Sequence, residues 1–162
     1  MGPKLNTFGK PCFQLNVYRR SPGAEFFLPV AMIERASEFA VGELAAEGML
    51  RGLDRERFIS RLAYHYDQVN YIHPFREGNG RAQRVFWNRI ALDAGWQLDW
   101  RPVHGQVNDL ASRAASDQRD LAPLQAMFGE IVAPAPPVRK RDGAWREAER
   151  ERMSFTNPNP NG

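Results

Sequence analysis

One short stretch of the 162-residue sequence gathers residue types that could do chemistry, and it reads HPFREGNGRAQR from His73 to Arg84. Gly78 and Gly80 allow a positive φ and leave no side chain in the way of a ligand. We expect the backbone N–H groups that follow them to open a new helix. A helix N-terminus preceded by such a turn binds anions, and the helix dipole helps. The pattern therefore predicts a phosphate cradle at residues 78–80.

The polar side chains of the same stretch fit phosphate chemistry. Arg81 and Arg84 lie three residues apart, so they share a helix face and can reach further phosphate oxygens. Glu77 would repel a bare phosphate but is suited to hold Mg²⁺, which bridges phosphates. Asn79 offers a side-chain amide to a phosphate oxygen, and His73 can accept a proton near neutral pH. Together these groups predict phosphoryl or nucleotidyl transfer.

The elements that must position this stretch are mostly helices. Apolar residues recur at helical spacing on both sides of it. Pro29 suits a first helical turn, and Asp54 is a good N-cap. Pro74 cannot continue a helix, and Gly95 is a typical helix stop. The expected helices cover residues 29–49, 55–73, 81–94, 106–115 and 121–132.

Apolar and aromatic residues of the later segments are expected in the core. In the helix over 81–94, Phe86 and Ile90 are predicted to face inward. Trp87, Trp96 and Trp100 are predicted to pack in the core rather than to form a platform for a nucleobase.

The ends of the chain differ from its helical centre. Residues 1–12 are predicted to be irregular, and residues 13–28 alternate apolar and polar types around a turn, which predicts a β-hairpin. Two strands alone are marginally stable, so the hairpin must lean on helices. From Ala133 the sequence is rich in proline and then in charged residues, which predicts a flexible tail over 133–162.

Composition and charge exclude several classes of protein. The sequence has no run of about 18 apolar residues, so no transmembrane helix is expected. Its N-terminus lacks a signal-peptide pattern, and Cys12 is the only cysteine, which suits a reducing cytoplasm. The pI of about 9.3 suggests nucleic acid. However, residues 133–162 hold six basic and four acidic residues, which leaves 16 basic and 15 acidic in the near-neutral body. No nucleic-acid partner is therefore expected.

The stretch also matches the Fic family motif, His-Pro-Phe-x-Asp/Glu-Gly-Asn-Gly-Arg-x-x-Arg, at every specified position. This match is far more specific than an isolated Gly-x-Gly. The resemblance implies a mainly α, Fic-type helical bundle, with a hairpin flap over 13–28 and a helical core over 29–132. Further segments that resemble Fic domains of bacterial toxins and secreted effectors are LDRE at 53–56, AGWQLDW at 94–100 and LAPL at 121–124.

The resemblance implies a role for each motif residue. In the family, the motif histidine deprotonates a hydroxyl of the target protein, which implies that His73 is the base. The hydroxyl oxygen attacks the α-phosphate of ATP, and pyrophosphate leaves. The acidic position, here Glu77, holds Mg²⁺, and the Gly-Asn-Gly loop at 78–80 cradles the phosphates. Two arginines, here Arg81 and Arg84, contact the terminal phosphates. The resemblance thus implies a protein AMP transferase that modifies Tyr, Thr or Ser.

Other implied features concern partners and packing. The motif phenylalanine is a core anchor in the family, which implies a structural Phe75. The flap aligns a segment of the target protein by strand addition, and Phe13–Val17 or Glu25–Leu28 would do so here. Many family members carry an inhibitory helix with the motif Ser/Thr-x-x-x-Glu-Gly/Asn, and this sequence has none. Its relatives often use a separate small antitoxin, whose glutamate would compete for Arg84. A bacterial toxin or effector is implied, in the bacterial cytoplasm or in the host cytosol.

Two other functions stay open. The same scaffold can use another diphosphate donor, such as UTP or CDP-choline. Fic domains usually have a further helix before the flap, and only about twelve residues precede it here. In the second alternative, the chain is a non-catalytic interaction module, because the missing helix has disabled nucleotide binding.

Overall fold

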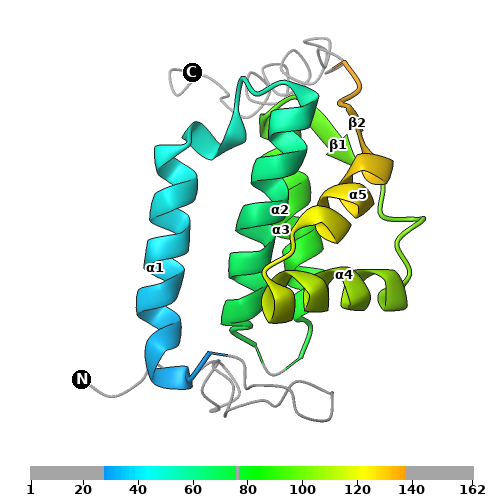
Figure 1. Ribbon diagram of the computed structural model, residues 1–162. Coiled ribbons are helices and arrows are strands. Elements are labelled where there is room, and N and C mark those ends of the chain that lie inside the picture. Colours follow the sequence, from blue (N-terminus) through cyan, green and yellow to red (C-terminus); the bar gives the residue numbers. More distant parts are fainter. Residues whose placement is uncertain (1–27, 76, 138–162) are drawn as a thin grey trace, which may run out of the picture.

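The computed structural model describes residues 28–75 and 77–137. The expected N-terminal hairpin, apart from its last residue, lies outside the described part of the chain, and so do residues 1–12 and the tail from residue 138. The described elements are the helices α1 (Val30–Ala46), α2 (Arg55–Ile72), α3 (Asn79–Asp93), α4 (Gly105–Gln118) and α5 (Ala122–Ile131), the 3₁₀ turn η1 (Gly48–Leu50), and the strands β1 (Trp96–Leu98) and β2 (Val132–Pro134) (Figure 1).

The five expected helices are confirmed, and their ends follow local chemistry. The Asp54 side chain accepts a hydrogen bond of 2.9 Å from the backbone N–H of Arg57, which caps α2. A proline occupies the first turn of α5. Beyond α3, Gly95 takes a φ of 87°, which a residue with a Cβ would adopt only with strain. The mainly helical fold class is therefore confirmed.

The small sheet is a feature that the sequence did not reveal. β1 and β2 pair antiparallel, with Gln97 opposite Ala133. The pairing continues through a hydrogen bond of 2.9 Å from the Ala135 N–H to the Gly95 carbonyl. Strands of three residues are too short to show an alternating pattern. The described structure continues to residue 137, whereas the sequence had placed the start of the tail at Ala133.

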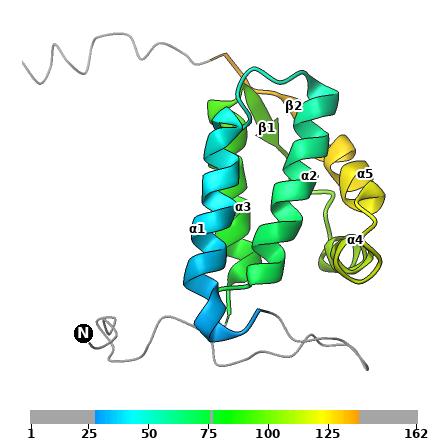
Figure 2. The ribbon, with the colours of Figure 1, turned by 60° about the vertical axis from the view of Figure 1, so that its left-hand side comes forward.

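Helix α2 is the centre of the packing. α1 lies on one side of it, and α4 and α5 lie on the other (Figures 1 and 2). Phe58, Leu62 and Tyr66 on α2 are buried in one cluster with Trp87 of α3 and Phe128 of α5. The ends of α2 and α3 are thereby held at fixed positions relative to each other.

The prediction of which α3 residues face the core is confirmed in part. Ile90 is buried, but Phe86 is 37% exposed, so its inward placement is wrong. The neighbouring Trp87 takes the core position instead and is fully buried. Trp96 and Trp100 are partly buried against the same core, so the prediction that the three tryptophans pack in the core is confirmed. The large indole of Trp87 removes more apolar surface from water than Phe86 would, which favours this rotation of the helix.

The seam between α1 and α2, where the two helices contact each other, is polar near the C-terminal end of α1. Glu47, at the end of α1, accepts two hydrogen bonds from the Arg61 guanidinium, and its Oε2 lies 3.4 Å from Nε2 of the buried His65. Glu43 accepts a hydrogen bond of 2.7 Å from the Gln68 amide. Toward the N-terminal end of α1, the seam is apolar and includes Ile33. None of the helices in the described ranges is both long and apolar enough to cross a membrane.

The Glu47–Arg61 pair should make stability depend on pH. The Arg61 hydrogen bonds lower the pKa of Glu47 below its usual 4.5, and this exceeds the opposing effect of burial. A depressed carboxyl pKa adds stability above the unfolded pKa, and this stability is lost as pH falls through the folded pKa. We expect Glu47→Gln to lower the free energy of unfolding by about 1 kcal/mol at pH 7 and much less near pH 3. Denaturant unfolding at both pH values measures this.

The matched control is Glu38→Gln, because Glu38 is exposed on the same helix. It should change stability little at either pH. An equal loss for Glu47→Gln at pH 7 and pH 3 would contradict the role of the ion pair.

Candidate active site

The loop between α2 and α3 begins with a strained histidine. His73 ends α2 in the left-handed region, with φ 47° and ψ 58°, and its N–H donates to the Val69 carbonyl at 3.2 Å. This conformation costs a residue with a Cβ about 1 kcal/mol or more, and Pro74 restricts it further. Strain of this kind is found where surrounding structure enforces it, often at functional sites. His73 is half-buried.

Asn79 braces the loop from inside. Its Oδ1 accepts a hydrogen bond of 2.9 Å from the Phe75 N–H, and its Nδ2 donates one of 2.5 Å to the Phe75 carbonyl. The side chain is buried, with 5% relative exposure. The sequence had offered this amide to a phosphate oxygen. In the structure, the oxygen and one N–H of the amide bond the loop backbone, and the contact with a phosphate oxygen stays a prediction.

The two glycines of the loop differ in conformation. Gly78 is the N-cap of α3 with φ 83°, and a Cβ there would lie 3.4 Å from Nη2 of Arg81. The positive φ expected for Gly80 is absent, since Gly80 lies within the first turn of α3 and a Cβ there would meet nothing within 4 Å. Gly80 therefore leaves open space at the helix entrance.

The first turn of α3 presents backbone N–H groups to the loop. The Ala82 N–H donates to the Gly78 carbonyl at 2.9 Å, which is the first hydrogen bond within the helix. The N–H groups of residues 79–81 precede it and have no acceptor within the helix, and the N-cap residue, Gly78, has no side chain to cap them. The positive end of the helix dipole lies at the same place, so the turn is suited to bind an anion.

Among the described residues, three charged side chains lie near this turn, and all are exposed. Glu77 lies in the loop next to Gly78. Arg81 folds back toward Gly78. Arg84 lies one turn further along, with its guanidinium carbon 5.3 Å from the ring centre of Trp100. The structure thus brings the sequence-predicted residues to one end of α3, as their closeness in the chain requires.

The packing of Phe75 differs from the expectation. Its side chain is 42% exposed, so the role of core anchor is wrong for the described structure. Its backbone, rather than its ring, is the part that Asn79 holds.

Sequence reasoning missed the residues that contact Arg84. Nη2 of Arg84 donates a hydrogen bond of 3.4 Å to the Val103 carbonyl. The indole N–H of Trp100 donates one of 2.8 Å to Oδ1 of Asn88. No motif contains these residues, because they meet only when the segment after β1 folds back onto α3.

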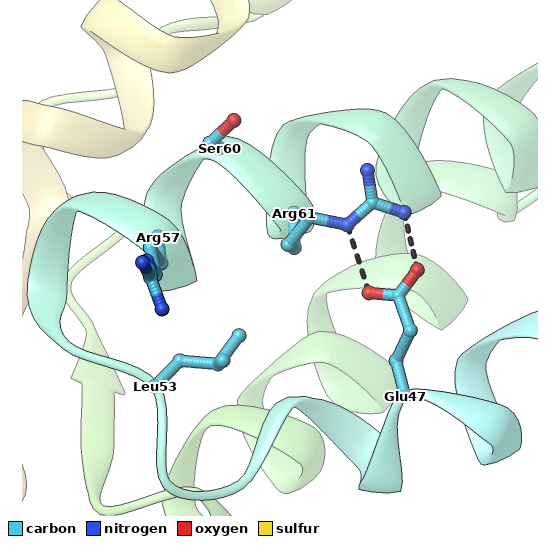
Figure 3. A pocket seen from close by; sticks show the side chains of 5 residues that line it. All are labelled: Glu47, Leu53, Arg57, Ser60 and Arg61. Atoms are coloured by element: carbon cyan, nitrogen blue, oxygen red, sulfur yellow. Dashed lines mark hydrogen bonds and ion pairs between the residues drawn. The ribbon is translucent and has the colours of Figure 1, made fainter.

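A cavity of about 450 Å³ lies elsewhere on the molecule (Figure 3). It lies at the start of α2, while His73 follows the other end of that helix. From Arg57 to His73 the helix rises by roughly 24 Å at about 1.5 Å per residue. The Glu47–Arg61 pair forms part of its wall, so we assign it to the α1–α2 seam. The residues that line it are Glu47, Leu53, Arg57, Ser60 and Arg61.

The amino-acid sequence of this chain is similar to the sequences of one known family. Residues 16–91 match the model of the Fic/DOC family. The chain is 37% identical over 109 residues to the "Probable protein adenylyltransferase Fic" of Escherichia coli (strain K12), a match that covers 67% of this chain and 54% of that relative. The chain therefore spans only about half the length of this curated relative.

Two solved structures from Bartonella have similar folds. The N-terminal Fic domain of a putative cell filamentation protein from Bartonella quintana, with bound ADP, has a TM-score of 0.74 and 26% identity. The match covers 82% of this chain and 62% of that one. The BepC protein of Bartonella tribocorum, with bound AMPPNP, has a TM-score of 0.69 and 26% identity, with 74% and 57% covered.

Substitution of the two loop glycines by alanine should change the stability of the protein in opposite directions. Gly78→Ala should destabilise the protein by about 1–2 kcal/mol, because alanine is strained at a positive φ. Gly80→Ala should stabilise it by about 0.5 kcal/mol, because alanine favours a helix and meets no neighbour. Thermal and denaturant unfolding of the two variants measure this contrast, and an equal effect of both substitutions would be inconsistent with it.

Proposed function

This chain belongs to the Fic/DOC family, and we propose that it transfers AMP from ATP with Mg²⁺ to a Tyr, Thr or Ser hydroxyl of a target protein. The observation that carries the proposal is the complete HPFREGNGRAQR sequence, in which His73 adopts a left-handed conformation and Gly78 begins α3. Two similarities support it. The Escherichia coli relative is named a probable protein adenylyltransferase, and the two Bartonella structures contain bound nucleotides.

We assign the proton transfer to His73. Its imidazole would take the proton of the target hydroxyl, whose oxygen attacks the α-phosphorus of ATP. A bond forms between that oxygen and phosphorus, and the bond to the departing pyrophosphate breaks. The left-handed turn at His73 and the braced loop after it would hold the imidazole in place before the target arrives.

The phosphates would lie on the first turn of α3. The N–H groups of residues 79–81 can donate to phosphate oxygens, and Arg81 and Arg84 supply positive charge at the same end of the helix. Gly80 leaves the space that the phosphate chain requires. These contacts bind and orient the nucleotide without a covalent step by the protein.

Glu77 is the residue that would hold Mg²⁺. The described residues contain no group of three His, Cys, Asp or Glu side chains suited to a metal. Mg²⁺ is commonly bound by one or two carboxylates together with nucleotide phosphates and water, and Glu77 can supply such a carboxylate. When bound, Mg²⁺ neutralises phosphate charge as the pyrophosphate departs. The exposed position of Glu77 beside Gly78 suits this role.

The proposal includes two protein partners. The target segment would pair with the expected hairpin at 13–28, by addition of a strand. A small antitoxin would regulate the enzyme by placing a glutamate against the exposed Arg84. The chain would then act as a bacterial toxin or effector, in the cytoplasm of the bacterium or of a host cell.

The test uses ATP labelled on the α-phosphate, with Mg²⁺ and a bacterial or host-cell lysate. Label on a protein band supports AMP transfer and identifies the target. Competition with unlabelled UTP and CDP-choline tests the donor, and transfer from either of these but not from ATP would overturn the proposal. Absence of Mg²⁺-dependent ATP binding would instead favour the interaction module.

His73→Ala should lower the rate of transfer by about 10²–10⁴-fold, because it removes the base. Binding of ATP should stay within about twofold, because the imidazole acts on the target hydroxyl rather than on the nucleotide. Single-turnover transfer and calorimetric ATP binding measure the two quantities. His104→Ala is the matched control, since His104 is exposed just before α4, and it should leave both quantities unchanged. Transfer at the wild-type rate by His73→Ala would refute the base assignment.

A further inference from the structure

The guanidinium of Arg84 is held on two sides although the residue is exposed. Its carbon lies 5.3 Å above the ring centre of Trp100, which is within the range of a cation–π interaction. Its Nη2 donates a hydrogen bond of 3.4 Å to the Val103 carbonyl. Both contacts come from the segment between β1 and α4, and neither uses a charged group. Arg84 therefore keeps its full positive charge for a ligand while its side chain is oriented.

The indole of Trp100 is itself fixed. Its N–H donates a hydrogen bond of 2.8 Å to Oδ1 of Asn88, which lies one turn beyond Arg84 on α3. Its ring lies edge-on to Phe128, with centroids 6.1 Å apart, and the ring of Tyr66 is 6.4 Å away. A ring that is tethered at one end and packed against two others cannot turn freely, so the surface that it offers to Arg84 is rigid.

Tyr66 ties this aromatic support to α4. Burial raises the pKa of Tyr66 to about 12, despite the nearby charge of Arg84. The hydroxyl is therefore protonated at neutral pH and donates a hydrogen bond of 2.8 Å to Oδ1 of Asn108 on α4. The support beneath Arg84 thus joins α2, α3, α4 and α5.

We propose that Trp100, held by Asn88, is a positioning residue that orients Arg84 toward the terminal phosphates of the nucleotide. The proposal rests on the proposed function, in which Arg84 contacts those phosphates. An arginine side chain loses much rotational freedom when it binds, and a support that restricts it beforehand reduces that loss. Trp100 should therefore increase affinity for ATP but not for AMP, which lacks the terminal phosphates.

The experiment is a double-mutant cycle on the full chain, with calorimetric binding of ATP and of AMP in the presence of Mg²⁺. Trp100→Leu should weaken ATP binding by about two- to fivefold, the equivalent of one cation–π contact, and leave AMP binding unchanged. In the Arg84→Ala background, Trp100→Leu should have no further effect on ATP, because its action passes through Arg84. Trp100→Phe keeps an aromatic face and should restore most of the affinity.

The matched control is Trp96→Leu. Trp96 is a partly buried indole of the same core, and it stacks on Phe58 at 5.7 Å. This substitution removes similar packing but does not affect the support of Arg84, so the ratio of ATP to AMP affinity should stay at the wild-type value. Any loss of stability common to both tryptophan variants is thereby separated from the effect on the nucleotide.

The possible failures are distinguishable. If Arg84→Ala itself leaves ATP binding unchanged, the phosphate role of Arg84 fails, and the positioning role of Trp100 fails with it. If Arg84→Ala weakens ATP binding but Trp100→Leu resembles Trp96→Leu, the proposed function stands and the positioning role is overturned. Equal losses from Trp100→Leu with and without Arg84 would also overturn it.

Discussion

The reversal of the chain between α2 and α3 depends on the two hydrogen bonds that the Asn79 amide makes with the Phe75 backbone. The chain must leave α2 through a left-handed His73, pass Pro74 and enter α3 within a few residues. Few backbone groups in so tight a loop can pair with one another, and a buried side chain that both donates and accepts replaces those pairs. The positions of His73, Glu77 and the N-terminus of α3 relative to one another follow from this brace.

The two helices on either side of the brace pack against each other in the core. Phe58 and Trp87 are fully buried in the core that α2 and α3 share, and further aromatic rings surround them. The outer helix α1 packs on α2 through apolar residues such as Ile33, and near its C-terminal end Glu47 adds hydrogen bonds with Arg61. Rigid apolar packing therefore lies beneath the loop, and the polar seam with its cavity lies toward the opposite end of α2.

The side chains of Glu77, Arg81 and Arg84 are exposed, whereas Asn79, which braces the loop, is buried. Arg84 shows how the fold reconciles these demands, because its charge stays in solvent while its side chain rests on Trp100. Neutral contacts of this kind orient a cation without neutralising it, whereas a carboxylate would compete with a phosphate. Orientation before binding is a general route to affinity and to catalysis.

The sequence by itself determined the helices and the clustering of candidate groups at 73–84, because helical periodicity, caps and neighbouring motif residues are local properties. It could not assign the inward position to Trp87 instead of Phe86, and it could not show that the Asn79 amide turns inward. It also missed the pairing of β1 with β2 and the support of Arg84 by Trp100. Only the tertiary structure decided these features. Each one depends on how segments pack against one another in space, and a local sequence pattern does not contain that information.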